Sequence, residues 1–436
     1  MRLSHAFPMA GIAALIPLSA SAETITVATV NNGDMVIMQS LTDKFEQAYP
    51  DIDLEWIVLE ENVLRQRMTV DIATGGGQFD VMTIGTYEVP IWAEQGWLTA
   101  FDDLPASYKV DDLLKPVRDG LSYEDTLYAV PFYGESSMLY YRKDLFEEQG
   151  IEMPEQPTWE QVREWAGKIH DPANDLYGIC LRGKPGWGEN MAFVSTLVNT
   201  FGGRWFDMEW QPEINSPEWQ EAISFYVELL NDYGPPGASA NGFNENQVLF
   251  ATGKCGMWVD ATSAAGKIFD PSESQVADVL GFAPAPVAVT PKGSHWLWSW
   301  ALAVPSSSDS KEAAQTFARW ATSQEYVELV GETEGWTSVP PGTRQSTYED
   351  PRYQKAAPFA DFVLQAMKTA DPTDSTLEPS PYVGVQFVGI PEFQAIGTQV
   401  GQMIAAALTG RMTVEQALER AQTSTERTMR QAGYYD

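Results

Sequence analysis

The chain has 436 residues, a length that exceeds what one hydrophobic core usually holds, so two lobes are expected. Its hydrophobic content of 44% is enough for a core in each lobe. It carries 27 Lys and Arg against 60 Asp and Glu, which gives a formal net charge of -33 at pH 7. Such an excess of negative charge repels phosphate backbones and anionic lipid headgroups, so nucleic acids and membrane surfaces are disfavoured as partners.

The first 22 residues have the pattern of a secretory signal. Arg2 supplies the positive end, residues 7–20 the apolar run, and Ala20-Ser21-Ala22 the small residues of a cleavage site, so the exported chain is expected to begin at Glu23. The apolar run is shorter than the about 20 residues that a membrane-spanning helix needs. We therefore expect an exported protein that is not inserted in a membrane.

The chain contains two cysteines, Cys180 and Cys255, and neither lies at the expected cleavage point, where a lipid anchor would require one. An exported protein without an anchor is retained only where a second membrane encloses its compartment, which indicates the periplasm of a Gram-negative bacterium. In that oxidising compartment the two cysteines are expected to form one disulfide, whereas in the cytosol they would be reduced core residues.

Strands and helices alternate in the first part of the chain. Apolar periodicity predicts strands over 24–30, 52–59 and 79–84, and helices over 35–49 and 62–74. This alternation predicts βαβ units and a mostly parallel sheet.

The rest of the chain predicts a second α/β unit and a helical end. Extended segments are expected at 127–131, 177–181, 256–259, 279–283 and 296–304. Helices are expected at 159–169, 217–232, 311–321, 392–408 and 413–430. We interpret the regions around 131–134, 298–301 and 338–341 as three crossovers between two interleaved lobes.

Five separate segments, in order, resemble those of a known family: VNNGDM (30–35), IGTYEVPIWAEQGWL (84–98), GKCGMWVDAT (253–262), SWALAVP (299–305) and YVGVQFVGIPEF (382–393). The whole exported chain resembles the extracellular solute-binding proteins of ABC sugar importers (family 1) and is similar in layout to maltose-binding proteins. Within that family the sequences of these segments are most similar to those of the sorbitol/mannitol (polyol)-binding subfamily.

This resemblance implies an α/β fold with two lobes, three crossovers and a ligand in the cleft, which is the type II periplasmic-binding-protein fold. The first lobe would comprise 23–132 plus 300–340, and the second 133–299 plus 341–436. The resemblance also implies a periplasmic monomer that captures a linear sugar alcohol by hinge closure and then docks on the permease subunits of an ABC transporter.

Other functions remain as alternatives to polyol capture. The ligand could be a mono- or oligosaccharide, and a glycoside hydrolase could use Glu135 and Asp260 as acid and base. Enzyme motifs such as H-E-x-x-H, G-x-S-x-G and G-x-x-x-x-G-K-[ST] are absent, and the exported chain keeps only His170 and His295. We therefore expect no enzyme activity, catalytic residue, cofactor or metal site.

A polyol presents hydroxyls and C–H faces, so its site needs hydrogen-bonding carboxylates and amides beside flat aromatic rings. Asn32 and Asp34 follow the first expected strand and Tyr87 follows the third, at the carboxyl edge where open α/β sheets bind ligands. Asp34 has the alternative role of a helix cap, and Tyr87 could instead pack on Trp92.

Glu135 follows the first crossover, where the resemblance implies a carboxylate against the ligand. Its alternative role is a salt bridge to Arg142 or Arg182, because a buried carboxylate needs a partner. In the loop RGKPGWGEN (182–190), Arg182 could bind hydroxyls or hold Glu135, and Trp187 could stack on the ligand or fill the hinge.

Trp258 and Asp260 alternate along one expected strand, so both leave the same face and could meet the ligand together. The alternative is a core Trp258 beside an Asp260 that caps the next helix.

Trp296, Trp298 and Trp300 repeat with a period of two and therefore share one strand face. We predict that Trp298 and then Trp296 serve the ligand, with Trp300 in the core. Trp336, at the third crossover, and Gln386 complete the predicted site.

Overall fold

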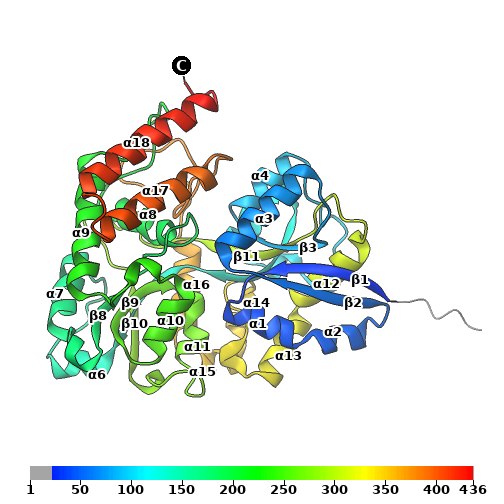
Figure 1. The fold of residues 1–436 in the computed structure, drawn as a ribbon. Helices are drawn as coiled ribbons and strands as arrows, with labels where there is room; N and C mark the ends of the chain where they lie inside the picture. The colour runs from blue at the N-terminus through cyan, green and yellow to red at the C-terminus, as the bar shows by residue number, and fades with distance from the viewer. Residues whose placement is uncertain (1–21, 436) are drawn as a thin grey trace, which may run out of the picture.

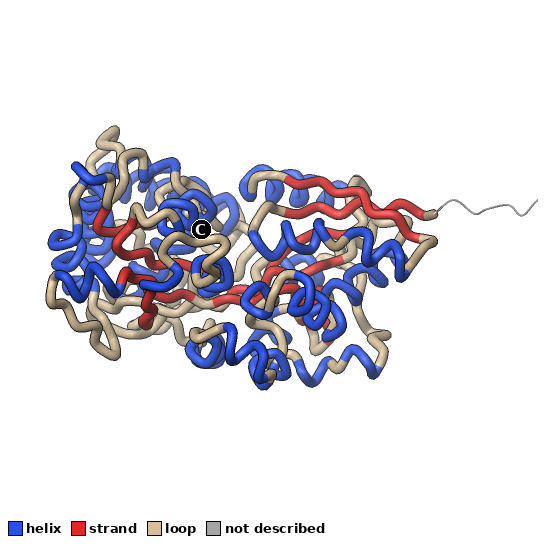
Figure 2. The backbone as a smooth tube through the Cα atoms, turned by 90° about the horizontal axis from the view of Figure 1, so that it is seen from below, coloured by secondary structure: helices blue, strands red, loops and turns tan. Residues whose placement is uncertain are grey.

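The computed structural model describes residues 22–435, so the expected signal segment lies outside the described residues apart from Ala22. The described chain folds into two lobes, each built around its own sheet (Figure 1). From below, the strands form two groups surrounded by helices and loops (Figure 2). Among residues 22–435, no helix is long and apolar enough to cross a membrane.

The first lobe contains a five-stranded sheet. In spatial order its strands are β2 (Ile52–Val58), β1 (Glu23–Thr29), β3 (Val81–Gly85), β11 (Trp298–Ala303) and β6 (Ala129–Glu135). Strand β1 pairs in parallel with β2 and β3, as the alternation of strands and helices predicts. Strand β11 returns from the second lobe and runs antiparallel to both of its neighbours.

The second lobe contains a four-stranded sheet. In spatial order its strands are β10 (Leu280–Pro284), β7 (Ser137–Arg142), β9 (Cys255–Ala261) and β8 (Tyr177–Cys180). Strands β8 and β9 are parallel, whereas β7 is antiparallel to both β9 and β10. The second sheet is therefore mainly antiparallel. A short hairpin, β4 (Ser122–Tyr123) and β5 (Thr126–Leu127), lies outside both sheets.

Helices cover both sheets (Figure 1). Those of the first lobe are α1 (Gly33–Ser40), α2 (Thr42–Ala48), α3 (Glu61–Thr74), α4 (Glu88–Glu94), α5 (Lys115–Gly120), α12 (Lys311–Ala321) and α13 (Gln324–Thr333). Those of the second lobe are α6 (Lys143–Glu148), α7 (Trp159–Ile169), α8 (Asn190–Thr200), α9 (Pro217–Tyr233), α10 (Phe243–Ala251), α11 (Ala265–Ile268), α17 (Phe393–Leu408) and α18 (Val414–Gln431). The segment after the third crossover forms α14 (Gln345–Glu349), α15 (Pro351–Ala356) and α16 (Ala360–Thr369).

The predicted helix over 35–49 is two helices, α1 and α2, which are separated at Leu41. Helix α1 also begins earlier than predicted, with Asn32 at its N-cap position. Asp34 is therefore a residue of the first helical turn, which rules out the cap position, the alternative role that the sequence left open for it.

The three segments that we interpreted as crossovers, 131–134, 298–301 and 338–341, lie together between the lobes. In the pairing of β11 with β6, Trp298 is opposite Glu135. The backbone N–H of Gly134 donates to the carbonyl of Pro341 at 2.8 Å, and a Cβ on Gly134 would lie 2.4 Å from the carbonyl oxygen of Gly342. Glycine is needed at position 134 because a side chain would collide with this backbone.

Residues that follow the third crossover still contact the first lobe. Arg344, which the expected boundary assigns to the second lobe, is fully buried, and its guanidinium donates to the carbonyls of Thr322 at 2.9 Å and Tyr108 at 3.0 Å. A buried guanidinium needs such acceptors, so these bonds fix the chain between the third crossover and α14.

Cys180, at the end of β8, and Cys255, at the start of β9, form a disulfide with a Cα–Cα distance of 5.9 Å. The two cysteines are therefore bonded, whereas the sequence also allowed reduced core residues. The bond joins two neighbouring strands of the second sheet, directly before the loop that carries Arg182 and Trp187.

Candidate functional site

Residues from both lobes line one cavity, which encloses about 490 Å³ between protein atoms, part of it open to solvent. The first lobe and the crossover strands supply Asn32, Glu61, Arg65, Glu135, Trp298 and Trp300. The second lobe supplies Arg182, Trp187, Phe243, Trp296, Gln386 and Phe387, with Gly188 from the loop before α8 and Ala192 from α8 itself. The cavity thus combines aromatic walls with a few polar groups, as small-ligand sites generally do.

Four indoles form the aromatic walls. Trp298 and Trp300 lie two residues apart on β11 and make an edge-to-face pair, with ring centroids 5.5 Å apart. Trp187 approaches from the second lobe, with its ring centroid 6.1 Å from that of Trp298. Trp296 lies just before β11, and its buried Nε1 has no hydrogen-bond partner among the described residues.

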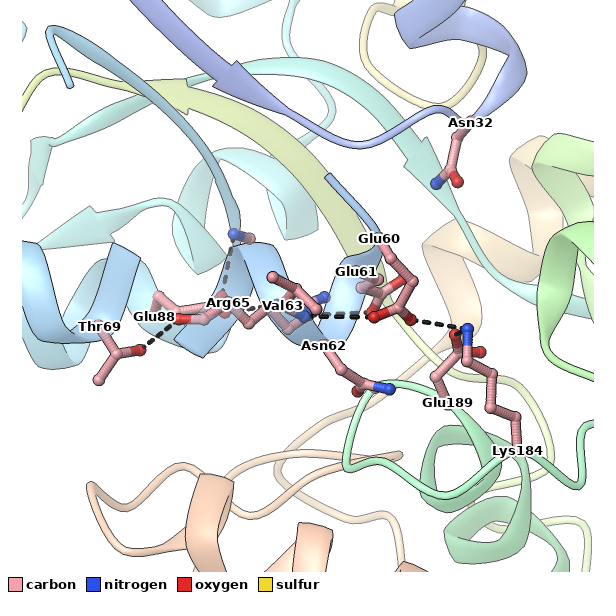
Figure 3. A network of polar contacts seen from close by, with 12 residues as sticks. Asn32, Glu60, Glu61, Asn62, Val63, Arg65, Thr69, Glu88, Lys184 and Glu189 are labelled. Atoms are coloured by element: carbon pink, nitrogen blue, oxygen red, sulfur yellow. Dashed lines mark hydrogen bonds and ion pairs between the residues drawn. The ribbon is translucent and has the colours of Figure 1, made fainter. Parts of the chain in front are cut away.

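Arg65 places a cation beside these rings. Its Nε lies 2.9 Å from a carboxylate oxygen of Glu61, and its Nη1 lies 2.5 Å from one of Glu88 (Figure 3). Its Cζ lies 4.3 Å from the ring centroid of Trp187 and 4.7 Å from that of Trp300. Burial opposes the charge of Arg65, but the two carboxylates outweigh burial and raise its pKa, so this side chain is a permanent buried cation.

Arg182 is the second cation of the cavity, and Asp260 on β9 holds it. The Nη2 of Arg182 lies 2.6 Å and its Nε 3.0 Å from the two oxygens of Asp260, while its Nη1 donates to the carbonyl of Gly188 at 3.0 Å. Asp260 also accepts from the indole of Trp258 at 3.1 Å and from the backbone of Ala261 at 2.7 Å. The fully buried Asp260 therefore positions Arg182 and is not free to act as a general base.

Glu135 is a nearly buried carboxyl at the end of β6. Ser263 donates to its Oε2 at 2.6 Å, and the guanidinium that the sequence offers as its partner, Arg182, is bound to Asp260 instead. Burial raises the pKa of Glu135 to about 8, although the Ser263 hydrogen bond and the charge of Arg182 act to lower it. At neutral pH this carboxyl is mostly protonated, so it can donate as well as accept a hydrogen bond.

Two amides complete the polar part of the cavity. Asn32 donates to the hydroxyl of Tyr133 at 3.0 Å and accepts from Asn244 at 3.3 Å. Gln386 donates to the carbonyl of Leu297 at 2.9 Å, and its buried Oε1 has no partner among the described residues. Since an amide has two donor hydrogens and two acceptor lone pairs, both side chains retain capacity for a ligand hydroxyl.

The structure thus gathers part of the predicted site into one cavity: Asn32, Glu135, Arg182, Trp187, Trp296, Trp298 and Gln386. Trp300 is buried in the core, as predicted, but it also lines the cavity, because the indoles of Trp298 and Trp300 leave the same face of β11.

The other predicted residues lie elsewhere. Asp34 lines a neighbouring second cavity, where burial raises its pKa to about 7. Tyr87 crosses to the second lobe, where its hydroxyl donates to the carbonyl of Ile390 at 2.8 Å and its ring packs on Trp187. Trp258 is fully buried and stacks on Tyr140, as a core Trp does.

Trp336 is also outside the cavity. It lies in a short 3-10 turn, and the Cζ of Arg352 is 4.0 Å from its ring centroid. A position at the third crossover was therefore not sufficient to bring an aromatic ring to the ligand cavity.

Several lining residues were not predicted, namely Glu61, Arg65, Gly188, Ala192, Phe243 and Phe387. Glu61 and Arg65 had a signal, because they are four residues apart on a predicted helix, which is the spacing of an ion pair. Phe243 and Phe387 had none, since a single Phe is usually part of the core.

The two lobes contact each other beside the cavity. Lys184 of the second lobe lies 2.7 Å from a carboxylate oxygen of Glu60 at the start of α3 (Figure 3). Asn62 donates to the carbonyl of Pro185 at 3.3 Å, and Thr69 donates to Gln394 at 3.1 Å. These contacts join the two lobes near the lining residues Glu61 and Arg65 of α3.

Comparison with known proteins places this arrangement in a family. Residues 30–328 match the family model of bacterial extracellular solute-binding proteins. A mannitol-binding protein of Pseudomonas aeruginosa is 60% identical over 421 residues, which cover 97% of this chain and 96% of that protein.

Two solved structures are similar over nearly the whole chain. An ABC transporter solute-binding protein from Agrobacterium vitis S4 with bound D-mannitol is 58% identical, with a TM-score of 0.94 over 95% of this chain and 100% of that one. A solute-binding protein from Agrobacterium radiobacter K84 in complex with ribitol is 25% identical, with a TM-score of 0.82 over 94% of this chain and 99% of that one.

Proposed function

The chain belongs to the bacterial extracellular solute-binding proteins, a family of binding proteins rather than enzymes, and we propose that it captures a linear sugar alcohol of the mannitol type for an ABC importer. The similarity to a mannitol-binding protein and to a protein with bound D-mannitol supports this ligand class. The proposal places the chain in the periplasm as a monomer that docks on the permease subunits.

The observation that carries the proposal is the composition of the cavity. Four indoles offer apolar faces for C–H groups, while Arg65, Arg182, Glu135 and the two amides surround them with donors and acceptors. A hexitol presents a hydroxyl on every carbon and a C–H group beside it, so it can satisfy both kinds of wall at once. A ligand with a net charge would disturb the balance that Asp260 and Glu61 give to the two guanidinium groups.

The ligand would also close the lobes, because the cavity takes residues from both. Arg65 and Trp298 belong to the first lobe, and Arg182 and Trp187 to the second. A ligand that contacts all four has a higher affinity for the closed form than for an open one, and this difference is what shifts the population toward closure. The hinge would comprise the crossover segments at Gly134, Trp298 and Pro341.

Binding of mannitol, sorbitol, ribitol, glucose and maltose, measured by calorimetry on the exported chain, tests the proposal. We expect the hexitols to bind and Trp298→Ala to weaken mannitol binding by about tenfold or more, which is about 1.4 kcal/mol. Trp336→Ala is the matched control, because this Trp lies outside the cavity, and its affinity should match that of the unaltered chain. Binding of glucose or maltose without the hexitols would contradict the polyol assignment.

A further inference from the structure

A second cavity lies next to the first and shares a wall with it. It encloses about 1210 Å³ between protein atoms, part of it open to solvent. Asn32 and Phe243 line both cavities, and they come from different lobes. The second cavity therefore continues the cleft beyond the candidate ligand site, and these two side chains stand at the boundary.

Hydrogen bonds hold the boundary in place. Asn32 donates to the hydroxyl of Tyr133 at 3.0 Å and accepts from the side chain of Asn244 at 3.3 Å, so it is fixed from both lobes. Ser263, which lines the second cavity, donates at 2.6 Å to Glu135, which lines the first. An amide held on both sides cannot turn aside without the loss of a bond between the lobes.

Packing fixes the other half of the boundary. Phe243, the first residue of α10, lies with its ring centroid 5.3 Å from the Cζ of Arg182 and 5.9 Å from the ring centroid of Trp258. Phe243 is 8% exposed. Because Arg182 is bound to Asp260 and Trp258 is fully buried, the ring of Phe243 has little room to withdraw.

The second cavity combines aromatic and polar side chains. Aromatic side chains line it, namely Tyr133, Tyr353 and Phe359, together with polar ones such as Asp34, Gln247 and Asp270. A hexose ring presents C–H faces and hydroxyls, which match such a lining. The lining of the second cavity therefore does not exclude a ligand that extends into it from the first cavity. The side chains at the boundary between the two cavities exclude such a ligand.

We propose that Asn32, Phe243 and Asn244 form a partition that sets the length of the ligand. The partition confines the ligand to a single hexitol in the first cavity and excludes a hexitol that carries an added sugar ring. This inference rests on the proposed function, since it assumes that a polyol occupies the first cavity. It assigns to Asn244 a role as a positioning residue, because this side chain acts on the ligand through Asn32.

The test compares mannitol with 1-O-glucopyranosyl-mannitol, which is mannitol with one added ring, by calorimetry on three variants. Phe243→Ala removes the ring from the partition, and Asn244→Ala releases Asn32 at a lower cost to packing. Gln247→Ala is the matched control, because it lies on the same helix and lines the second cavity but not the first. A thermal unfolding scan of each variant shows which of them are folded.

We expect the unaltered chain and Gln247→Ala to bind mannitol and to reject the longer ligand. Phe243→Ala or Asn244→Ala should gain affinity for the longer ligand by about tenfold or more relative to the unaltered chain, with mannitol binding weakened or unchanged. Equal binding of both ligands by the unaltered chain would overturn the partition, as would no gain in either folded variant. If the unaltered chain does not bind mannitol, the proposed function itself fails.

Discussion

The guanidinium of Arg182 lies against the carboxylate of Asp260, with Nη2 2.6 Å from Oδ1, and this pair lies at the candidate ligand cavity on the side of the second lobe. Arg182 reaches the cavity, whereas Asp260 is fully buried behind it. Burial opposes the charge of Arg182, but Asp260 outweighs burial and raises its pKa. The carboxylate that the sequence places in the cleft thus acts through its arginine.

Loss of this carboxylate should destabilise the protein. Asp260→Asn keeps the volume of the side chain but leaves the buried guanidinium of Arg182 without its anion, so we expect the free energy of unfolding to fall by about 3 to 5 kcal/mol. Urea denaturation of the chain from Glu23 onward measures this change. Glu228→Gln is the control, because it breaks an exposed pair with Arg163, and a loss below about 1 kcal/mol is expected there. Equal losses in both variants would contradict the role of Asp260.

The rate of ligand release should depend on Lys184. This side chain pairs with Glu60 across the lobes and with Glu189 in its own loop (Figure 3). Lys184→Met removes the attraction between the lobes, so mannitol should dissociate about two to five times faster, which corresponds to the loss of a partly exposed ion pair. Stopped-flow Trp fluorescence measures this rate.

The matched control for Lys184 is Lys254→Met. Lys254 pairs with Asp175 within the second lobe, so its removal should leave the dissociation rate unchanged. Raised salt should also speed release from the unaltered chain more than from Lys184→Met, because only the former keeps the pair that salt screens. An identical rate in all three proteins would show that the pair does not hold the lobes together.

Stability should fall as the pH rises, and Glu135 should account for part of the slope. Burial raises its pKa to about 8 from 4.5, so between these values the folded protein binds a proton that the unfolded chain has released. The free energy of unfolding is therefore expected to fall by at most about 1.4 kcal/mol per pH unit for this group. Asp34 and Glu189, with pKa values that burial raises to about 7, act in the same direction.

Glu135→Gln should flatten this pH dependence, because an amide does not titrate. Urea denaturation at several pH values between about 5 and 8 measures the slope for both proteins. Glu55→Gln, which alters an exposed side chain on β2, is the control and should leave the slope as it is. A slope that is the same with and without Glu135 would mean that this carboxyl is ionised in the folded protein at neutral pH.

Reduction of the disulfide should also lower stability. Cys180 and Cys255 are 75 residues apart, and the loss of chain entropy that such a bridge imposes on the unfolded state corresponds to about 4 kcal/mol. The double variant Cys180→Ser and Cys255→Ser should lose a similar amount in urea denaturation. A reducing agent should destabilise the unaltered chain and have no effect on the double variant; an equal effect on both would contradict the prediction.

Much of the fold could be predicted because its signals are local. Helix α7 follows Thr158, whose hydroxyl accepts from the backbone of Gln161 while the Gln161 side chain accepts in return, and this capping box is readable from four residues. In strand β11, Trp298 and Trp300 are two residues apart, and this spacing predicts that both indoles lie on one face of the strand. Periodicity and capping depend on neighbours in the chain, so the sequence by itself determined these elements and the shared face of the two β11 indoles, whereas the place of Trp300 at the cavity was not predicted.

Other parts of the site were decided by tertiary structure. Asn32 and Asn244 are 212 residues apart, and Arg182 and Asp260 are 78 residues apart, yet each pair makes a hydrogen bond beside the candidate ligand cavity. No local pattern shows whether Asp260 meets a ligand or holds an arginine, because its side chain leaves the same face of the strand in either role. The tertiary structure decides between these two roles, because it determines which charges and rings the two lobes bring within a few ångströms of each other. Burial then makes an unpaired charge costly, and this strengthens the pairing.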